Sequence, residues 1–107
     1  MKILLDESLP RKLRYDFDKE HEVATVRDMG WLGKMNGELL KLMSINRFHL
    51  FVTVDRNLPY QQNLERLTLT MCVLCAVDNR RETLELLPPK MFSPLEQGNL
   101  QNVIEIY

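Results

Sequence analysis

Long apolar runs, an excess of one charge and abundant cysteine are all lacking in this sequence of 107 residues. No apolar run approaches the roughly 20 residues needed to cross a bilayer, so we expect no membrane association and a cytoplasmic location. The formal net charge of -1 excludes a composition that is typical of general polyanion binding. Any nucleic acid would have to be held by a local basic patch or through metal ions.

Only two cysteines are present, Cys72 and Cys75, and their C-x-x-C spacing is also found in zinc and thiol redox sites. They lie in an apolar run, 69–76, that predicts a buried strand. Residues three apart on a strand face opposite sides, so the two thiols should point away from each other. We therefore expect ordinary core cysteines, which behave as small hydrophobic side chains.

Familiar nucleotide-binding and hydrolase motifs are missing as well. The sequence contains no Walker loop, no G-x-G-x-x-G and no arrangement of Ser, His and Asp that suggests nucleophilic catalysis. His21 and His49 precede predicted strands, which places them at the edge of the sheet opposite to the acids discussed below. Linkers and low-complexity tracts are also absent from the sequence, which predicts a single domain over residues 1–107.

One sequence pattern occurs twice in the chain. The segments ILLDESLP (3–10) and FVTVDRNLP (51–59) each contain an apolar run, an aspartate, one charged residue, a helix-capping residue and Leu-Pro. Each run predicts a buried strand, and each capping residue with its proline predicts a helix start. If the two strands are parallel, Asp6 and Asp55 emerge at the same carboxyl edge, where open α/β sheets bind ligands.

Strand and helix signals alternate along the chain, which predicts an α/β fold with a parallel sheet and helices on both faces. A first helix is expected to begin near Ser8, with Leu9, Leu13 and Phe17 on one face. Further helices are expected to begin at residue 36, at residue 57, and at residue 79 or 83. The expected strands cover residues 2–5, 22–26, 50–54, 69–77 and 103–107.

Acidic residues are predicted at the carboxyl ends of strands or the amino ends of helices: Asp6, Glu7, Asp28, Glu38, Asp55 and Asp78. Two or three carboxylates suffice for a hard cation such as Mg²⁺, which takes oxygen ligands and keeps several waters. Each acid also has a simpler explanation, since acidic residues cap helices and favour the positive end of the helix dipole. Asp6 and Asp55 stand out because Ser8 and Asn57 are available as caps, which leaves the aspartates without an obvious structural task.

Basic and aromatic residues are expected beside the same edge. Trp31, in a loop with two glycines, has two interpretations, because it could stack on a base or pack against the sheet. The basic residues could contact phosphate, although for each alone a solvated surface charge is the better explanation. They are Arg27, Lys34, Arg56, Arg80 and Arg81.

Four segments together resemble the small PIN-like domains: LLDESLP (4–10), VRDMGW (26–31), NGELL (36–40) and VTVDRNLP (52–59). Their order and spacing extend this resemblance over essentially the whole chain. The resemblance implies a three-layer α/β/α sandwich with a central, mainly parallel sheet of about five strands. It also implies a metal-dependent ribonuclease, often the toxin of a toxin–antitoxin pair.

Carried over by position, the resemblance implies that Asp6, Glu38 and Asp55 hold Mg²⁺ or Mn²⁺. Asp78 lies where the fourth acid of the catalytic set could fall. The implied partners are an RNA substrate, contacted by residues such as Arg56, Arg80 and Trp31, and a small antitoxin protein. Homodimerisation is compatible with the sequence, although no residue specifies it. Ser8 stands where related sequences usually have asparagine, which is a mild departure because both residues cap helices.

Two other functions stay open. The receiver domain of a phosphorelay also uses an acidic pair like Asp6-Glu7 and a phosphoacceptor aspartate like Asp55. It requires a lysine after the fifth strand, and none follows residues 103–107 here. A PIN-like module that binds RNA or a protein without catalysis would keep Asp6 and Asp55 but would lose its affinity for metal.

Overall fold

The computed structural model describes residues 1–34, 36–54, 70–75, 80–90 and 103–107. Within these residues the central element is a five-stranded sheet in which all neighbouring strands are parallel and follow the order β2-β1-β3-β4-β5. The predicted α/β class and the parallel sheet are therefore confirmed. The strands are β1 (Lys2–Leu5), β2 (Glu22–Thr25), β3 (Leu50–Thr53), β4 (Thr70–Leu74) and β5 (Val103–Ile106).

The central strands β1, β3 and β4 are buried on both faces, which explains why their sequences are almost continuously apolar. Alternate side chains of β1 enter two separate cores. Ile3 and Leu5 belong to the core on one face of the sheet, whereas Leu4 belongs to the core on the other face.

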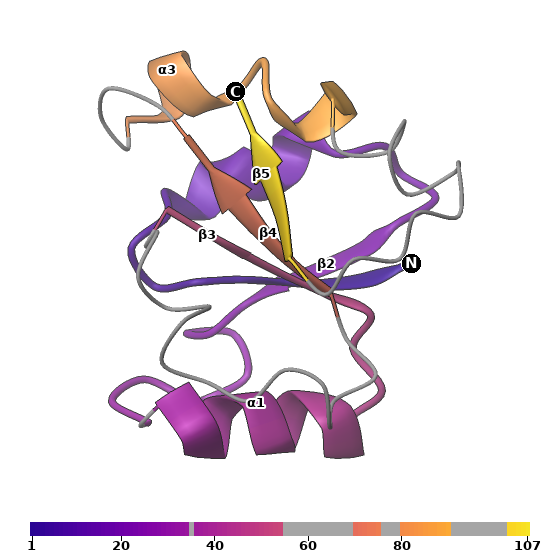
Figure 1. The fold of residues 1–107 in the computed structure, drawn as a ribbon, viewed down its shortest axis with the longest axis vertical. Helices are drawn as coiled ribbons and strands as arrows, with labels where there is room; N and C mark the ends of the chain where they lie inside the picture. The colour runs from indigo at the N-terminus through magenta and orange to yellow at the C-terminus, as the bar shows by residue number, and fades with distance from the viewer. Residues whose placement is uncertain (35, 55–69, 76–79, 91–102) are drawn as a thin grey trace.

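Helical segments cover both faces of the sheet (Figure 1). The 3-10 helix η1 (Arg11–Asp16) and the short helix α3 (Arg81–Leu84) lie on one face, and α1 (Asn36–Ile45) lies on the other. Since β2 and β3 flank β1 on opposite sides, right-handed crossovers in opposite directions place η1 and α1 on opposite faces. In its described part the first of these layers contains only short helices, so the predicted three-layer sandwich is not confirmed.

The first helix differs from the prediction of an α-helix capped by Ser8. The N-cap position of η1 is Pro10, which makes no side-chain capping bond, and the Leu13 amide donates to the Pro10 carbonyl at 3.0 Å, an i to i+3 bond. The Ser8 hydroxyl donates instead to the carboxylate of Asp6. The predicted apolar face is nevertheless correct, because all three of its residues are buried: Leu9, Leu13 and Phe17. The helix expected from residue 57 lies outside the described residues.

Cys72 lies in β4 and Cys75 directly follows this strand; both cysteines are free and buried. Cys72 belongs to the core beneath η1 and α3, whereas Cys75 belongs to the core beneath α1. The prediction that the thiols face opposite sides of the sheet is confirmed, so they do not form a common site.

The histidines lie at the amino edge of the sheet, as predicted. His49 accepts a 2.9 Å hydrogen bond from the amide of Lys2, and His21 lies 3.1 Å from the terminal amino group of Met1. Both side chains therefore form hydrogen bonds near the amino ends of strands, at the edge of the sheet opposite to the candidate site. Among the described residues, no helix has the length and apolar character needed to span a membrane.

Candidate functional site

Asp6 is the first residue after β1, and it lies opposite Thr53 at the carboxyl ends of two paired strands. The register pairs Leu5 with Val52, and the Asp6 amide donates to the Val52 carbonyl at 2.9 Å. β1 is also the strand at which the winding of the sheet reverses, because β2 and β3 flank it. Open α/β sheets bind ligands at such a switch point, so the structure places Asp6 where a ligand is expected.

Three hydrogen-bond donors among the described residues hold the carboxylate of Asp6. Its Oδ2 atom accepts bonds of 2.9 Å from the hydroxyls of Ser8 and Thr53, and its Oδ1 atom accepts a 2.8 Å bond from the Glu7 amide. A carboxylate has about four lone-pair positions, so within the described residues one position on Oδ1 stays open. The side chain is thus fixed in orientation while keeping room for one further ligand.

This network corrects the expectation that Asp6 has no structural task. The Asp6 carbonyl accepts a 3.0 Å bond from the Leu9 amide, and its carboxylate holds the following turn through Glu7 and Ser8. The reason is that Ser8 does not cap a helix, which leaves its hydroxyl available to Asp6. Asp6 therefore stabilises the turn between β1 and η1, whatever else it does.

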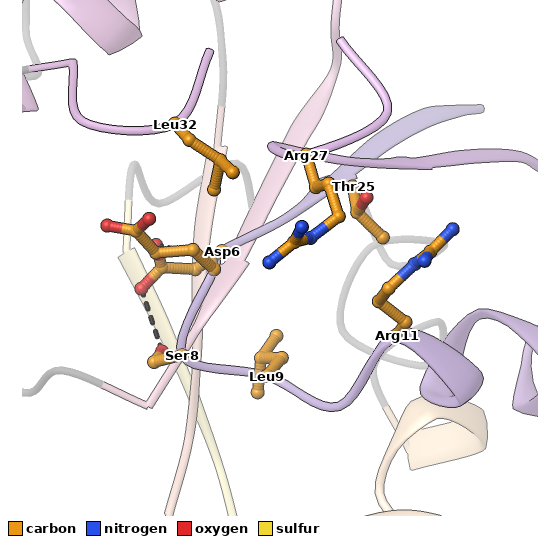
Figure 2. Close-up of a pocket in the computed structure, with 8 residues that line it drawn as sticks. Asp6, Ser8, Leu9, Arg11, Thr25, Arg27 and Leu32 are labelled. Carbon is orange, nitrogen blue, oxygen red and sulfur yellow. Dashed lines mark hydrogen bonds between the residues drawn. The ribbon is translucent and has the colours of Figure 1, made fainter. Parts of the chain in front are cut away.

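A cavity of about 320 Å³ opens beside Asp6, between the turns that follow β1 and β2. Figure 2 shows the side chain of Arg27 reaching into the space between Asp6 and Arg11. Arg27 is exposed, and its guanidinium makes no hydrogen bond or ion pair with any described residue. Leu9 and Leu32 provide apolar lining. The cavity thus combines an oriented carboxylate with a cation that no described acid neutralises.

Glu38 lies in the first turn of α1, as the sequence predicted. Its side chain is 53% exposed, and Oε1 accepts a 3.3 Å hydrogen bond from Nζ of Lys34. This ion pair joins Glu38 to a residue just before α1 and is exposed on the surface, so it restrains the carboxylate only weakly.

The predicted metal group consists of Asp6, Glu38 and Asp55. Among the described residues, no three His, Cys, Asp or Glu side chains gather closely enough to hold a metal ion. Asp55 and Asp78 lie outside the described residues, so the complete group stays a prediction. The donor that is described fits a hard cation, because Asp6 has one carboxylate position that no described residue occupies, and Mg²⁺ or Mn²⁺ takes oxygen ligands. Ligating carboxylates are commonly oriented by further hydrogen bonds, as Asp6 is.

Asp28, a weaker candidate from the sequence, has a clear structural role. Its carboxylate accepts a 3.1 Å bond from the Thr25 amide and a 3.2 Å bond from Arg14, with Arg11 at 3.6 Å. The backbone hydrogen bond from Thr25, followed by the Thr25 hydroxyl and the two guanidiniums, lowers the pKa of Asp28 despite its partial burial. Asp28 therefore ties the turn after β2 to η1.

The substrate candidate Trp31 packs against the sheet. Its ring meets that of Phe48 edge-on, with centroids 5.9 Å apart and an interplanar angle of 68°, and it adjoins the core beneath α1. Packing is therefore the role that the structure describes, and stacking on RNA stays a prediction.

The basic candidates differ in their surroundings. Arg80 is exposed at the N-cap of α3, whereas Arg56 lies outside the described residues. Arg81 donates to both carboxylate oxygens of Asp16, at 3.3 and 3.2 Å, and so joins α3 to η1. Lys34 pairs with Glu38 as described above. Arg27 is the basic residue that lines the cavity beside Asp6 without a described partner.

Thr53 is the residue that sequence reasoning missed. Its signal was present, because it precedes Asp55 by two residues and ends the strand that pairs with β1. A threonine in an otherwise apolar run was simply expected to be part of the strand.

The fold and the site together define an α/β protein with an oriented carboxylate at the switch point of a parallel sheet. No protein-family model, curated protein or solved structure matches this chain. The site geometry and the segments that resemble PIN-like domains are therefore the basis of the function proposed below.

Proposed function

We propose that this chain is a metal-dependent endoribonuclease of PIN-like type, in which Asp6, Glu38 and Asp55 hold Mg²⁺ or Mn²⁺. The observation that carries the proposal is the position of the Asp6 carboxylate. It lies at the switch point of the sheet, is oriented by Ser8 and Thr53, and borders a cavity containing Arg27, which has no partner among the described residues.

The sequence position of Asp55 supports a second carboxylate near Asp6. Asp55 follows Thr53 by two residues, and two residues of extended chain span at most about 7 Å. Thr53 is itself hydrogen-bonded to Asp6. Two carboxylates brought close together repel each other unless a cation lies between them. Asp78 completes the proposed catalytic set.

A bound dication would neutralise charge on the scissile phosphate and lower the pKa of an attacking water. The residues of the chain would supply binding and orientation. Thr53 and Ser8 would keep the Asp6 carboxylate in one direction, and Arg27 would provide a charged hydrogen-bond donor for a phosphate oxygen. Arg56, Arg80 and Trp31 are the further residues proposed to contact RNA.

The cleavage proposal is tested by Asp6→Asn, assayed on a labelled RNA with and without Mn²⁺. Asparagine can still accept from the Glu7 amide and donate to the hydroxyls of Ser8 and Thr53, so stability should change by less than about 1 kcal/mol. Metal-dependent cleavage should disappear, because an amide is a far poorer ligand for a dication than a carboxylate. Asp18→Asn, at an exposed acid, is the matched control. Wild-type cleavage by the Asp6→Asn variant would end the proposal.

A toxin role is part of the proposal, with a small antitoxin protein that covers the carboxylate edge. Expression of the chain alone should then slow growth of the host, and expression with the product of a neighbouring reading frame should restore it. Normal growth on expression of the active protein alone would remove the toxin role while leaving the cleavage proposal intact. The oligomeric state, including a homodimer, can be measured by light scattering of the same samples.

An inactive PIN-like binding module is the second candidate, because three hydrogen bonds from described residues already hold the Asp6 carboxylate without a cation. Calorimetric titration with Mn²⁺ separates the two: binding is expected for the nuclease, whereas no binding in the millimolar range would favour the module. Incubation with acetyl phosphate tests the receiver function, for which a stable acyl-phosphate on Asp55 would be required.

A further inference from the structure

A second hollow, of about 240 Å³, lies on η1 and adjoins the cavity beside Asp6. It is lined by Arg11, Lys12, Arg14 and Tyr15, which we call the η1 surface. Arg11 lines both hollows, so the η1 surface continues the cavity that contains Asp6 and Arg27. A ligand that extends beyond the Asp6 cavity in this direction would therefore meet the η1 surface.

The η1 surface concentrates positive charge in a chain whose net charge is only -1. Its lining contains three cations and no acid. Asp28, which lies beside it, pairs with Arg11 and Arg14 and so offsets part of this charge. Lys12 is exposed and makes no ion pair within the described part of the chain. The hollow therefore keeps an excess of positive charge that suits an anion.

Tyr15 adds an aromatic ring to this basic surface. The residue is 65% exposed, so its ring is not required by the core. The guanidinium of Arg14 lies 5.1 Å from the ring centroid and donates to the Tyr15 hydroxyl at 3.2 Å, which holds the ring in place. An exposed ring among cations is the arrangement on which nucleic-acid bases stack while their phosphates are neutralised.

We infer that the η1 surface binds a nucleotide of single-stranded RNA next to the phosphodiester held at Asp6, with Tyr15 stacking on the base and Lys12 contacting a phosphate. This inference rests on the proposed function, which supplies the RNA. An acidic protein would be attracted by the same cations, but it would gain little from an exposed tyrosine ring. RNA is therefore the occupant that the whole set of side chains favours.

The test measures fluorescence anisotropy of a labelled single-stranded RNA, about 12 nucleotides long, in EDTA so that binding is separated from cleavage. Tyr15→Ala should weaken binding by about fivefold or more, because one stacked base is lost. Tyr15→Phe keeps the ring and should bind within about twofold of wild type. Lys41→Ala, at an exposed cation on α1, is the control and should have no effect.

Salt dependence identifies the phosphate contact. Lys12→Ala should reduce the slope of log Kd against log salt concentration by about 0.7, the value for one contact to a single strand. Equal affinities for wild type, Tyr15→Ala and Lys12→Ala would overturn the inference. An equal loss of RNA affinity in Lys41→Ala would also overturn it. So would competition by poly-glutamate that requires the cations of the η1 surface, if Tyr15→Ala did not change the affinity for RNA.

The inference and the nuclease proposal fail separately. Tyr15-dependent binding is measured in EDTA with wild-type Asp6 and reports on the η1 surface, whereas metal-dependent cleavage reports on Asp6. Binding that depends on Tyr15, without any metal-dependent cleavage, would support the η1 surface and reject the nuclease. If cleavage depends on Asp6 but Tyr15→Ala does not change the affinity for RNA, only the proposed role of the η1 surface is rejected.

Discussion

The hydroxyl of Thr53 donates a 2.9 Å hydrogen bond to Oδ2 of Asp6 across the carboxyl ends of β3 and β1. Thr53 is fully buried, whereas Asp6 is partly exposed beside the cavity. The bond therefore connects the rigid centre of the sheet to the candidate site. It makes the direction of the carboxylate depend on the pairing of two strands that are far apart in the sequence.

Thr53→Val should test this dependence. Valine keeps the shape of the side chain but removes the hydroxyl, so we expect a loss of about 1 kcal/mol in the free energy of unfolding. RNA cleavage should fall without disappearing, because the Asp6 carboxylate keeps its ligand atoms but loses one of the donors that orient it. The measurements are urea unfolding and cleavage at saturating Mn²⁺. Thr70→Val, a buried threonine at the amino end of β4, should leave cleavage unchanged.

Glu38→Gln separates a ligand role from a surface ion pair. The pair with Lys34 is exposed, so stability should change by less than about 0.5 kcal/mol. Cleavage and Mn²⁺ affinity should both fall by about tenfold or more if the carboxylate holds the metal. Lys34→Gln breaks the same ion pair but keeps the acid, and it should cleave RNA as wild type does. Equal activities for the two variants would remove Glu38 from the proposed site.

The lowered pKa of Asp28 should make the stability of the protein depend on pH. Its pKa is lowered below the ordinary value of 3.8, mainly by the Thr25 amide, so its contribution is complete above that value and is lost as the pH falls through the lowered folded-state pKa. Asp28→Asn should therefore be less stable than wild type by about 1 kcal/mol at pH 7, with the difference shrinking under strongly acidic conditions.

Urea unfolding at pH 7 and in steps below pH 4 measures this difference. Asp18→Asn changes an exposed acid near the end of η1, and its free energy of unfolding at neutral pH should be close to that of wild type. A constant gap between Asp28→Asn and wild type down to the most acid conditions would contradict the assignment, because the ionised form of Asp28 would then not be what stabilises the fold.

Cys72 should be chemically silent in the folded protein. It is completely buried, and burial raises the pKa of its thiol to about 12. At pH 8 only about one thiol in ten thousand would be ionised, and the thiolate is the reactive form. Ellman's reagent should therefore leave Cys72 of a Cys75→Ala variant unmodified until urea unfolds the protein. Rapid labelling under native conditions would show that β4 is accessible to the reagent.

Much of the fold follows from the sequence, because a parallel strand buried on both faces has to be apolar nearly throughout. The segments 2–5 and 50–54 satisfy this requirement, and strands were observed there as expected. Because successive side chains of a strand point to opposite faces of the sheet, Cys72 and Cys75 were also correctly predicted to lie on opposite faces. These predictions succeed because they depend on local pattern and on burial alone.

The turn after β1 is where local pattern was insufficient. A serine before Leu-Pro is equally suited to capping a helix and to donating to a neighbouring aspartate, since both use the same hydroxyl. The outcome depends on Thr53, which the sheet brings to Asp6 and which then shares Oδ2 with Ser8. No spacing within residues 3–10 contains that information. The metal group stays a prediction because Asp55 and Asp78 lie outside the described residues.

The central position of β1 has a consequence for how the protein is made. β1 pairs with β2 on one edge and with β3 on the other, so the second edge is filled only after residue 53 has been synthesised. A nascent chain that has left the ribosome only as far as α1 thus carries an apolar strand with an unpaired edge, the kind of surface that aggregates or recruits chaperones. Fragments that stop short of β3 would expose this edge permanently and would lack the Thr53 hydroxyl that helps to orient Asp6.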